Sequence, residues 1–325
     1  MLRPLSLARL NTPLHPLRRA SERLGTEVWI KRDDLTGFGM SGNKVRKLEF
    51  LMAEASALGA DTVITCGGVQ SNHCRATAVA CRQLGLEPVL LLRSADGPPA
   101  GPPDSNLLLN TLLGAAVHWT DMDGWRERDA RMAAIAEELT ARGRRPYIIP
   151  EGGSNAVGSL GYVRAGQELA AQALAEGVRF DTIIHATGSG GTLAGLALAG
   201  LDARVLGVCV CDDADYFRRR VAAIAADAVP YGLTLPPAGD RWDALEGYQG
   251  RGYALSRPEE LRALAQLARE EGVLLDPVYT GKAWYALNDT LSRDPTAFGR
   301  RVLFWHTGGA FGLFGRGEAI AAALN

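Results

Sequence analysis

The segment DTIIHATGSGGTLAGLALAG, residues 181–200, decides the fold of this chain because it joins a strand to a helix through a turn rich in glycine and hydroxyl groups. Residues 181–186 contain an apolar run that is typical of a strand buried on both faces of a parallel sheet. The turn TGSGGT, residues 187–192, supplies three glycines and three hydroxyls at the start of an apolar helix. Glycine permits close backbone approach, and a helix N-terminus offers unpaired N–H groups to an anion. The segment therefore predicts a phosphate cradle, with a glycine turn that only allows close helix packing as the alternative.

Two motifs that are typical of nucleotide-binding sites are absent, and this limits the kinds of phosphate ligand that we expect. It does not fit G-x-G-x-x-G, because residue 193 is leucine, and the chain contains no G-x-x-x-x-G-K-[ST] motif. A dinucleotide or a nucleoside triphosphate is thus disfavoured. A small cofactor with a single phosphate fits better.

The rest of the chain repeats the alternation of strand and helix. One helix is predicted over residues 44–59, KVRKLEFLMAEASALG, where apolar residues recur on one face. This alternation predicts an α/β fold with right-handed crossovers. Residues 94–104 are predicted to form a surface loop and residues 227–253 a long functional loop. The predicted strands are residues 26–32, 61–66, 88–93, 115–120, 146–150, 181–186, 203–210 and 301–306.

Four of these strands run into glycine-rich, polar sequences. Ligands of open α/β sheets bind beyond the carboxyl ends of the strands, so these sequences are candidate site segments. They are GGVQSNH (67–73), EGGSN (151–155), TGSGGT (187–192) and TGG (307–309).

Composition excludes several classes of protein. A length of 325 residues suggests two domains, and a net charge of -1 argues against a basic nucleic-acid binder. No apolar run is long enough for a signal peptide or a membrane span. Five cysteines without a C-x-x-C pair, and five widely separated histidines, predict neither a disulfide framework nor a metal site. We expect a cytoplasmic protein without nucleic-acid or membrane partners.

Lysine is scarce, since only four of the 35 basic residues are lysine. Arginine cannot replace lysine where an amine must lose its proton and act as a nucleophile. Lys44 follows a glycine-rich turn and begins a helix, where both the helix dipole and burial lower an amine pKa. Lys47, one turn later, is predicted to face solvent; Lys31 is assigned no chemistry, and Lys282 is expected near the cleft. Lys44 alone would be read as a surface lysine, but together with a phosphate cradle it favours pyridoxal phosphate, which carries an aldehyde and a phosphate.

Five motifs in order resemble those of the D-cysteine desulfhydrase and 1-aminocyclopropane-1-carboxylate deaminase family. These are pyridoxal-phosphate enzymes of the tryptophan-synthase-β fold type. The resemblance implies two open α/β domains with mostly parallel sheets, the cofactor in the interdomain cleft, and a homodimer. It implies a larger cofactor-binding domain of residues 1–50 and 165–325 and a smaller α/β domain of residues 51–164. The motifs are SGNKVRKLEF (41–50), GGVQSNHCRATA (67–78), TGSGGTLAGL (187–196), DPVYTGKA (276–283) and HTGG (306–309).

The resemblance also implies roles for individual residues. Lys44 would form the Schiff base with the cofactor and move the substrate α-proton. Ser71 and Asn72 would hold the substrate carboxylate, Asn72 also lying near the cofactor 3-hydroxyl, whereas His73 either binds carboxylate or packs beside the cleft. Tyr279 would lie over the cofactor near the substrate. Ser71 and Tyr279 are counted as catalytic with Lys44, Tyr253 is a second substrate-binding tyrosine, and Asn43 is given no separate role. The cofactor would also contact Thr187, Gly188, Ser189, Gly190, Gly191, Thr192 and Thr307.

Two positions separate the activities of this family. Deaminases resemble one another in having glutamate and leucine where this chain has Thr280 and Thr307, the hydroxyl pattern of the desulfhydrases. The resemblance therefore implies α,β-elimination, with D-cysteine converted to pyruvate, ammonia and hydrogen sulfide. L-Cysteate sulfo-lyase and then 1-aminocyclopropane-1-carboxylate deaminase are the alternatives. A non-catalytic binder of a small phosphorylated metabolite is the alternative from another class.

Overall fold

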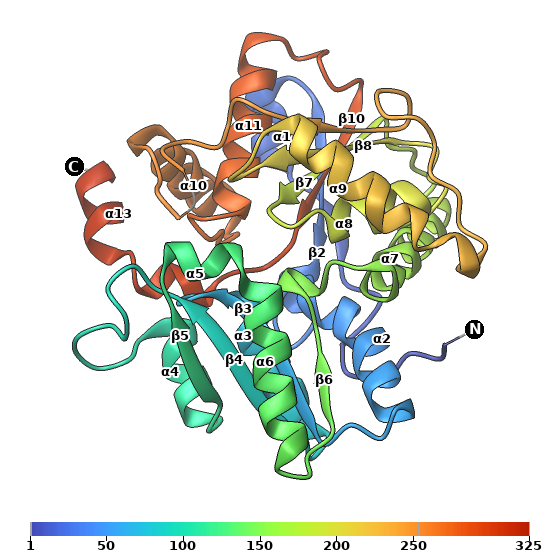
Figure 1. Ribbon diagram of the computed structural model, residues 1–325. Coiled ribbons are helices and arrows are strands. Elements are labelled where there is room, and N and C mark those ends of the chain that lie inside the picture. Colours follow the sequence, from blue (N-terminus) through green and yellow to red (C-terminus); the bar gives the residue numbers. More distant parts are fainter. Residues whose placement is uncertain (1, 253, 325) are drawn as a thin grey trace.

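The computed structural model describes residues 2–252 and 254–324. Its strands form two sheets, which occupy the upper and lower halves of the molecule in Figure 1. Within the described residues the larger sheet has six strands in the order β1-β2-β10-β7-β8-β9, and the smaller has four in the order β5-β4-β3-β6. The strands are β1 (Leu14–Pro16), β2 (Glu27–Arg32), β3 (Thr62–Gly68), β4 (Glu87–Arg93), β5 (Ala116–Thr120), β6 (Pro146–Ile148), β7 (Thr182–Thr187), β8 (Arg204–Cys209), β9 (Trp242–Leu245) and β10 (Arg301–His306).

All eight predicted strands are present, and the predicted α/β class with two mostly parallel sheets is confirmed. Every strand pair is parallel except β1 with β2. Strands β1 and β9 are not among the predicted strands. Residues 227–253 are therefore not a loop throughout, because Trp242 and its neighbours pair with Val205 and extend the larger sheet at its edge.

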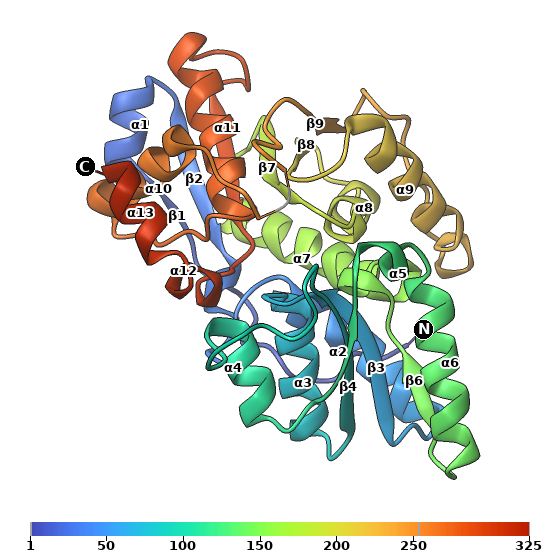
Figure 2. The ribbon, with the colours of Figure 1, turned by 60° about the vertical axis from the view of Figure 1, so that its left-hand side comes forward.

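Helices cover both faces of both sheets, as Figures 1 and 2 show. The helices α1, α10 and α11 pack on one face of the larger sheet, and α7, α8 and α9 pack on the other. The main helices in the described part of the chain are α1 (Arg18–Leu24), α2 (Lys44–Ala57), α3 (Asn72–Gln83), α4 (Ser105–Leu112), α5 (Met122–Arg126), α6 (Arg128–Ala141), α7 (Ala156–Ala175), α8 (Gly191–Leu198), α9 (Ala214–Ala226), α10 (Pro258–Glu271), α11 (Thr280–Arg293), α12 (Phe311–Phe314) and α13 (Gly317–Leu324).

Successive residues of the larger sheet pack into different cores. On β7, Ile183 belongs to the core beneath α7 and α8, whereas Ile184 belongs to the core beneath α10 and α11. On β10, Leu303 and Phe304 divide in the same way. Both faces of the sheet are therefore covered, which explains why these strands read as unbroken apolar runs.

A buried ion cluster joins α2 and α7 to the larger sheet. The carboxylate of Asp33 accepts hydrogen bonds from Arg46 (2.8 and 2.9 Å), Tyr162 (2.6 Å) and Trp305 (2.8 Å). Arg46 also pairs with Glu168, which in turn pairs with Lys31. Lys31, which has no assigned chemistry from its sequence context, is therefore a structural residue. None of the helices in the described part of the chain combines the length and apolar character needed to cross a bilayer.

Candidate active site

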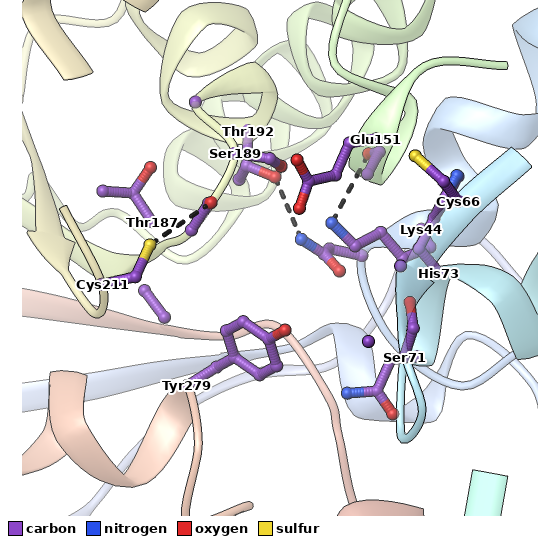
Figure 3. Close-up of a pocket in the computed structure, with 18 of the residues that line it drawn as sticks. Lys44, Cys66, Ser71, His73, Glu151, Thr187, Ser189, Thr192, Cys211 and Tyr279 are labelled. Carbon is purple, nitrogen blue, oxygen red and sulfur yellow. Dashed lines mark hydrogen bonds between the residues drawn. The ribbon is translucent and has the colours of Figure 1, made fainter. Parts of the chain in front are cut away.

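A cavity of about 410 Å³ lies where the carboxyl ends of strands from both sheets meet. Strands β7 and β10 end at its wall from the larger sheet, and β3 and β4 from the smaller sheet. The turn η2 (Glu151–Gly153), which follows β6, forms another part of the wall. All four glycine-rich segments identified in the sequence contribute residues to this one cavity. Figure 3 shows its principal side chains.

Lys44 lies at the first position of α2 and faces the cavity (Figure 3). Its Nζ donates to the carbonyl of Gly152 at 3.5 Å. Burial lowers the pKa of the Lys44 amine to about 8, against the opposing influence of Glu151 and Cys74. At pH 7 about a tenth of this amine is therefore unprotonated and able to react with an aldehyde, far more than for a lysine with the ordinary pKa of 10.5.

Gly152 has to be glycine for this arrangement. Its φ is +66°, and a Cβ atom there would lie 2.4 Å from Ser189 Oγ and 3.3 Å from Lys44 Nζ. The turn therefore brings its backbone directly against both the lysine and the glycine-rich turn of residues 187–192.

Lys47 does not face solvent, so the prediction for this residue is wrong. Its side chain is 1% exposed, and its Nζ donates to Gly152 O (3.1 Å) and Ser154 Oγ (3.2 Å). Residues three apart lie on the same helix face, so the side chain of Lys47 points in the same direction as that of Lys44. The helices α7 and α3 pack against α2 and cover it. A Cβ on Gly191 would lie 2.7 Å from Lys47 Nζ, which places the amine against the start of α8. Burial, with the charges of Lys44 and Arg220, lowers its pKa well below the ordinary value.

The glycine-rich turn between β7 and α8 has the form of an anion cradle. Gly190 has a φ of +84°, and Gly191 N donates to Ser154 Oγ at 3.2 Å. Ser154 Oγ in turn donates to Ser189 Oγ at 2.8 Å. The buried hydroxyl of Thr187 has no hydrogen-bond partner among the described residues. An orphaned hydroxyl, a helix N-terminus and a nearby lysine together fit a phosphate group.

Asn43, which the sequence left without a role, tethers this turn to α2. Its Nδ2 donates to Thr192 Oγ1 at 3.0 Å (Figure 3). The residue before Lys44 is thereby bound to the first turn of α8, so the lysine and the phosphate cradle are held at a fixed separation.

The segment Ser71–His73 lines another part of the cavity. Ser71 is the N-cap of α3 and its Oγ accepts from Cys74 N (3.2 Å), and Asn72 Oδ1 accepts from Asn106 Nδ2 (3.1 Å). Both side chains are therefore fixed where α3 begins.

His73 is engaged in a different way from either neighbour. Its Nε2 lies 2.9 Å from Thr65 Oγ1, whose hydroxyl donates to Ile149 O, so the assigned tautomer has Nε2 as the donor. Burial, with the charges of Lys44 and Lys47, lowers the pKa of His73 well below its ordinary value. A neutral ring whose remaining nitrogen is an acceptor does not donate to a carboxylate, which favours the packing alternative.

Asp276 positions Tyr279 at the cavity. Its carboxylate accepts from the backbone N–H of Val278, Tyr279 and Thr280 (2.8 to 2.9 Å) and from Thr280 Oγ1 (2.6 Å). The Thr280 hydroxyl therefore donates its hydrogen bond to Asp276, and Thr280 is not among the residues that line the cavity. Thr307 does line the cavity. Tyr253 lies outside the described residues.

A polar wall that the sequence analysis did not predict completes the cavity. The guanidinium carbons of Arg93 and Arg128 lie 4.9 and 5.2 Å from the ring centre of Trp125, an arrangement typical of cation–π contacts. Arg128 Nε also lies 3.3 Å from Glu151 Oε2. Only Glu151 lay within a segment that the sequence singled out, EGGSN. The others come from β4, α5 and α6, which are separate in sequence and meet only in the folded smaller sheet.

Comparison with known proteins identifies the class of this site. The family model described as "Pyridoxal-phosphate dependent enzyme" matches residues 5–308, and the chain belongs to this family. It is therefore dependent on pyridoxal phosphate, as the sequence predicts. The Lys44 amine and the turn of residues 187–192, with the Lys47 amine beside it, have the chemistry to react with the aldehyde and to bind the phosphate of this cofactor.

The relatives narrow the class to one branch. The chain is 44% identical to the bifunctional D-cysteine desulfhydrase/1-aminocyclopropane-1-carboxylate deaminase of Arabidopsis thaliana, a mitochondrial protein, over 99% of this chain and 83% of that one. It is 44% identical to D-cysteine desulfhydrase of Yersinia pestis, over 93% and 92% of the two chains. A solved structure described as an ACC deaminase homologue has 37% identity and a TM-score of 0.90, covering 99% of this chain and 96% of its own. The predicted family resemblance is confirmed.

Proposed function

We propose that this protein is a pyridoxal-phosphate-dependent carbon–sulfur lyase that eliminates sulfide from D-cysteine and yields pyruvate and ammonia. The observation that carries the proposal is the convergence of a lysine with a lowered pKa and a phosphate cradle on one cavity. The D-cysteine desulfhydrase of Yersinia pestis, at 44% identity, supports the choice of substrate.

When bound, pyridoxal phosphate supplies the electron sink that stabilises negative charge at the substrate Cα. We propose that Lys44, Asn72, Thr307 and the turn of residues 187–192 hold the cofactor, with Lys47 and Ser154 added as phosphate ligands by their contacts.

The remaining steps belong to side chains of this chain. Lys44 Nζ removes the α-proton, since its free amine is available near neutral pH. Ser71 and Asn72, fixed at the N-terminus of α3, hold the substrate carboxylate, and Tyr279, held by Asp276, lies against the substrate. Tyr253 is retained as a proposed substrate residue. His73 is proposed to orient Thr65 and the strand β3 rather than to bind carboxylate.

A substrate panel on the purified protein tests the proposal. We expect pyruvate from D-cysteine and from β-chloro-D-alanine, and less from L-cysteate and from L-cysteine. Formation of 2-oxobutanoate from 1-aminocyclopropane-1-carboxylate as the main activity would instead favour the deaminase alternative, which the bifunctional Arabidopsis relative keeps open. Binding of phosphorylated ligands without turnover of any amino acid would favour the non-catalytic alternative.

The cellular setting is part of the same proposal. We propose a cytoplasmic homodimer, with a larger domain of residues 1–50 and 165–325 and a smaller domain of residues 51–164. The composition of the two sheets supports this division, because β3 to β6 form one sheet and the remaining strands form the other. Sedimentation of the purified protein at twice the chain mass would support the dimer.

A further inference from the structure

We propose that Glu151 is a further catalytic residue, a carboxylic acid that protonates the group leaving from Cβ. This inference rests on the proposed lyase function and deepens it. It concerns which residue assists the departure of a poor leaving group.

The position of Glu151 is the first part of the argument. It lies on η2 immediately before Gly152, whose carbonyl accepts from Lys44 Nζ at 3.5 Å. In Figure 3 the carboxyl group of Glu151 and the amine of Lys44 both point into the cavity. The amine that removes the α-proton and a carboxyl group therefore line the same cavity, where the Glu151 side chain is 37% exposed.

The neighbours of Glu151 orient its carboxyl group and leave it able to interact with a substrate. Within the described residues its ion-pair partner is Arg128, at 3.3 Å, and Arg128 Nε makes no hydrogen bond there. Arg128 is itself fixed, because Nη1 donates to Trp125 O at 3.2 Å and the guanidinium lies over the Trp125 ring. Glu151 is thus oriented by a held arginine and keeps an oxygen free of any protein hydrogen bond in the described chain.

The electrostatic setting favours the acid form. Burial raises the pKa of Glu151, and the nearby charges of Arg128, Arg93, Lys44 and Arg220 offset this only in part. Four other titratable groups near it stay uncharged, because burial raises the pKa of each; they are Cys66, Cys74, Cys211 and Tyr216. The carboxyl group of Asp212 also lines the cavity. A carboxyl group with a raised pKa that lines a cavity is better suited to donate a proton than an exposed glutamate.

The chemistry explains why such an acid matters for one substrate and not another. In the proposed step Lys44 takes the Cα proton, the Cβ–O bond breaks, and the hydroxyl leaves as water with the proton of Glu151. Hydroxide is a poor leaving group, so this step needs an acid. Chloride leaves without one. Thiolate is intermediate, and the site would therefore accept all three substituents, with only the β-hydroxy substrate strongly dependent on Glu151.

The test compares leaving groups in the holoenzyme. We expect the wild-type protein to form pyruvate from D-serine, D-cysteine and β-chloro-D-alanine. Glu151→Gln should lower kcat/KM for D-serine by about 100- to 10,000-fold, the usual range for a general acid. It should change kcat/KM for β-chloro-D-alanine by less than about 3-fold, since chloride needs no proton. Glu151→Asp, which keeps an acid, should lose less D-serine activity than Glu151→Gln.

A second measurement does not depend on turnover. In the cofactor-free protein, infrared difference spectra should show a carboxylic-acid carbonyl band that titrates above the range of exposed glutamates and disappears in Glu151→Gln. Asp123→Asn, which removes an exposed carboxylate of α5 paired with Arg126, is the matched control and should leave the band and all three activities unchanged.

Several results would overturn the inference. They are an equal loss for D-serine and β-chloro-D-alanine in Glu151→Gln, no D-serine turnover by a wild type that processes the other two substrates, or a carbonyl band that survives Glu151→Gln. A wild type that processes none of the three would overturn the proposed lyase as well, so the two failures are distinguishable.

Discussion

Lys44 and Lys47 lie one turn apart on α2, and burial gives each a pKa below that of a free lysine. They differ in what surrounds the amine. Lys44 Nζ opens onto the cavity, whereas Lys47 Nζ is enclosed by Gly152 O and Ser154 Oγ beside the phosphate cradle. The first amine is available for covalent chemistry, and the second is available only as a hydrogen-bond donor to an anion.

The lowered pKa of Lys44 gives a pH dependence for cofactor uptake. Only the unprotonated amine attacks an aldehyde, so the rate of pyridoxal phosphate addition to the cofactor-free protein should rise with pH and level off above the pKa of about 8. Stopped-flow recording of the visible absorption between about pH 6 and pH 10 measures this rate. Lys44→Ala should give no such absorption. A midpoint near the ordinary lysine value of 10.5 would contradict the role of burial.

The contacts of Lys47 predict a separate effect on affinity. Lys47→Met should weaken pyridoxal phosphate binding by about 10- to 100-fold, the range for one hydrogen bond to a charged group such as the phosphate. Equilibrium titration of the cofactor-free variant measures this affinity. Lys31→Met is the matched control, because Lys31 is also buried but pairs with Glu168 away from the cavity. It should reduce stability and leave cofactor affinity unchanged; equal affinity losses in both variants would refute the phosphate contact.

Among the elements, α2, α7 and α8 pack unusually close together because glycines face each contact. A Cβ on Gly161 of α7 would lie 2.2 Å from Arg46 O on α2. A Cβ on Gly195 of α8 would lie 2.4 Å from Ser159 O on α7. Because of these close contacts, α2, which carries both lysines, and α8, which begins at the glycine-rich turn, pack against the same helix, α7.

The close contact of α2 with α7 predicts a cost for any side chain between them. Gly161→Ala should lower the free energy of unfolding by about 1–3 kcal/mol or more, because the three atoms nearest to the added Cβ are backbone atoms of Arg46 and Lys47 and cannot rotate away. Cofactor affinity should fall as well, since α2 would shift with its lysines. Thermal denaturation with and without pyridoxal phosphate measures both effects. Gly317→Ala, at a glycine with no atom within 4 Å of the added Cβ, is the control and should be neutral.

Over the whole molecule, the buried cluster around Asp33 joins the larger sheet to α2 and α7. Burial alone would raise the pKa of Asp33, but the Arg46 guanidinium and the hydrogen bonds from Tyr162 and Trp305 outweigh it, and the pKa is lowered. Burial opposes Arg46 and Lys31 in the same way at Glu168, whose pKa is also lowered. Both carboxylates therefore favour the folded state when they are ionised.

This cluster predicts how stability depends on pH. A carboxylate with a lowered folded-state pKa contributes its full stability above the unfolded-state pKa, and that contribution is lost as pH falls through the folded-state pKa. Asp33→Asn should destabilise the protein by about 3–5 kcal/mol at neutral pH, because it leaves Arg46 partly unpaired in the interior. It should also flatten the loss of stability below about pH 4. Urea unfolding at a series of pH values measures both, and an unchanged acid slope would contradict the account.

Much of the molecule was predictable because its signals are local. The strands of the larger sheet read as apolar runs since both faces are covered, and TGSGGT lies between a strand and a helix in sequence as in space. The edge strand β9 was not predictable from its four residues. Its place depends on pairing with β8, more than thirty residues earlier in the chain.

The sequence by itself determined the α/β class and placed the glycine-rich turn of residues 187–192 and Lys44 among the candidate site residues, because each of these signals depends on residues adjacent along the chain. Only the tertiary structure decided that Lys31 and Lys47 are buried and which residues form the polar wall of the cavity. Lys47 is buried because α3 and α7 cover its helix, and Thr280 faces Asp276 rather than the cavity because that carboxylate caps its helix. Arg93, Trp125, Arg128 and Glu151 meet because parallel strands bring their carboxyl ends to one edge of a sheet, a proximity that no spacing along the chain encodes.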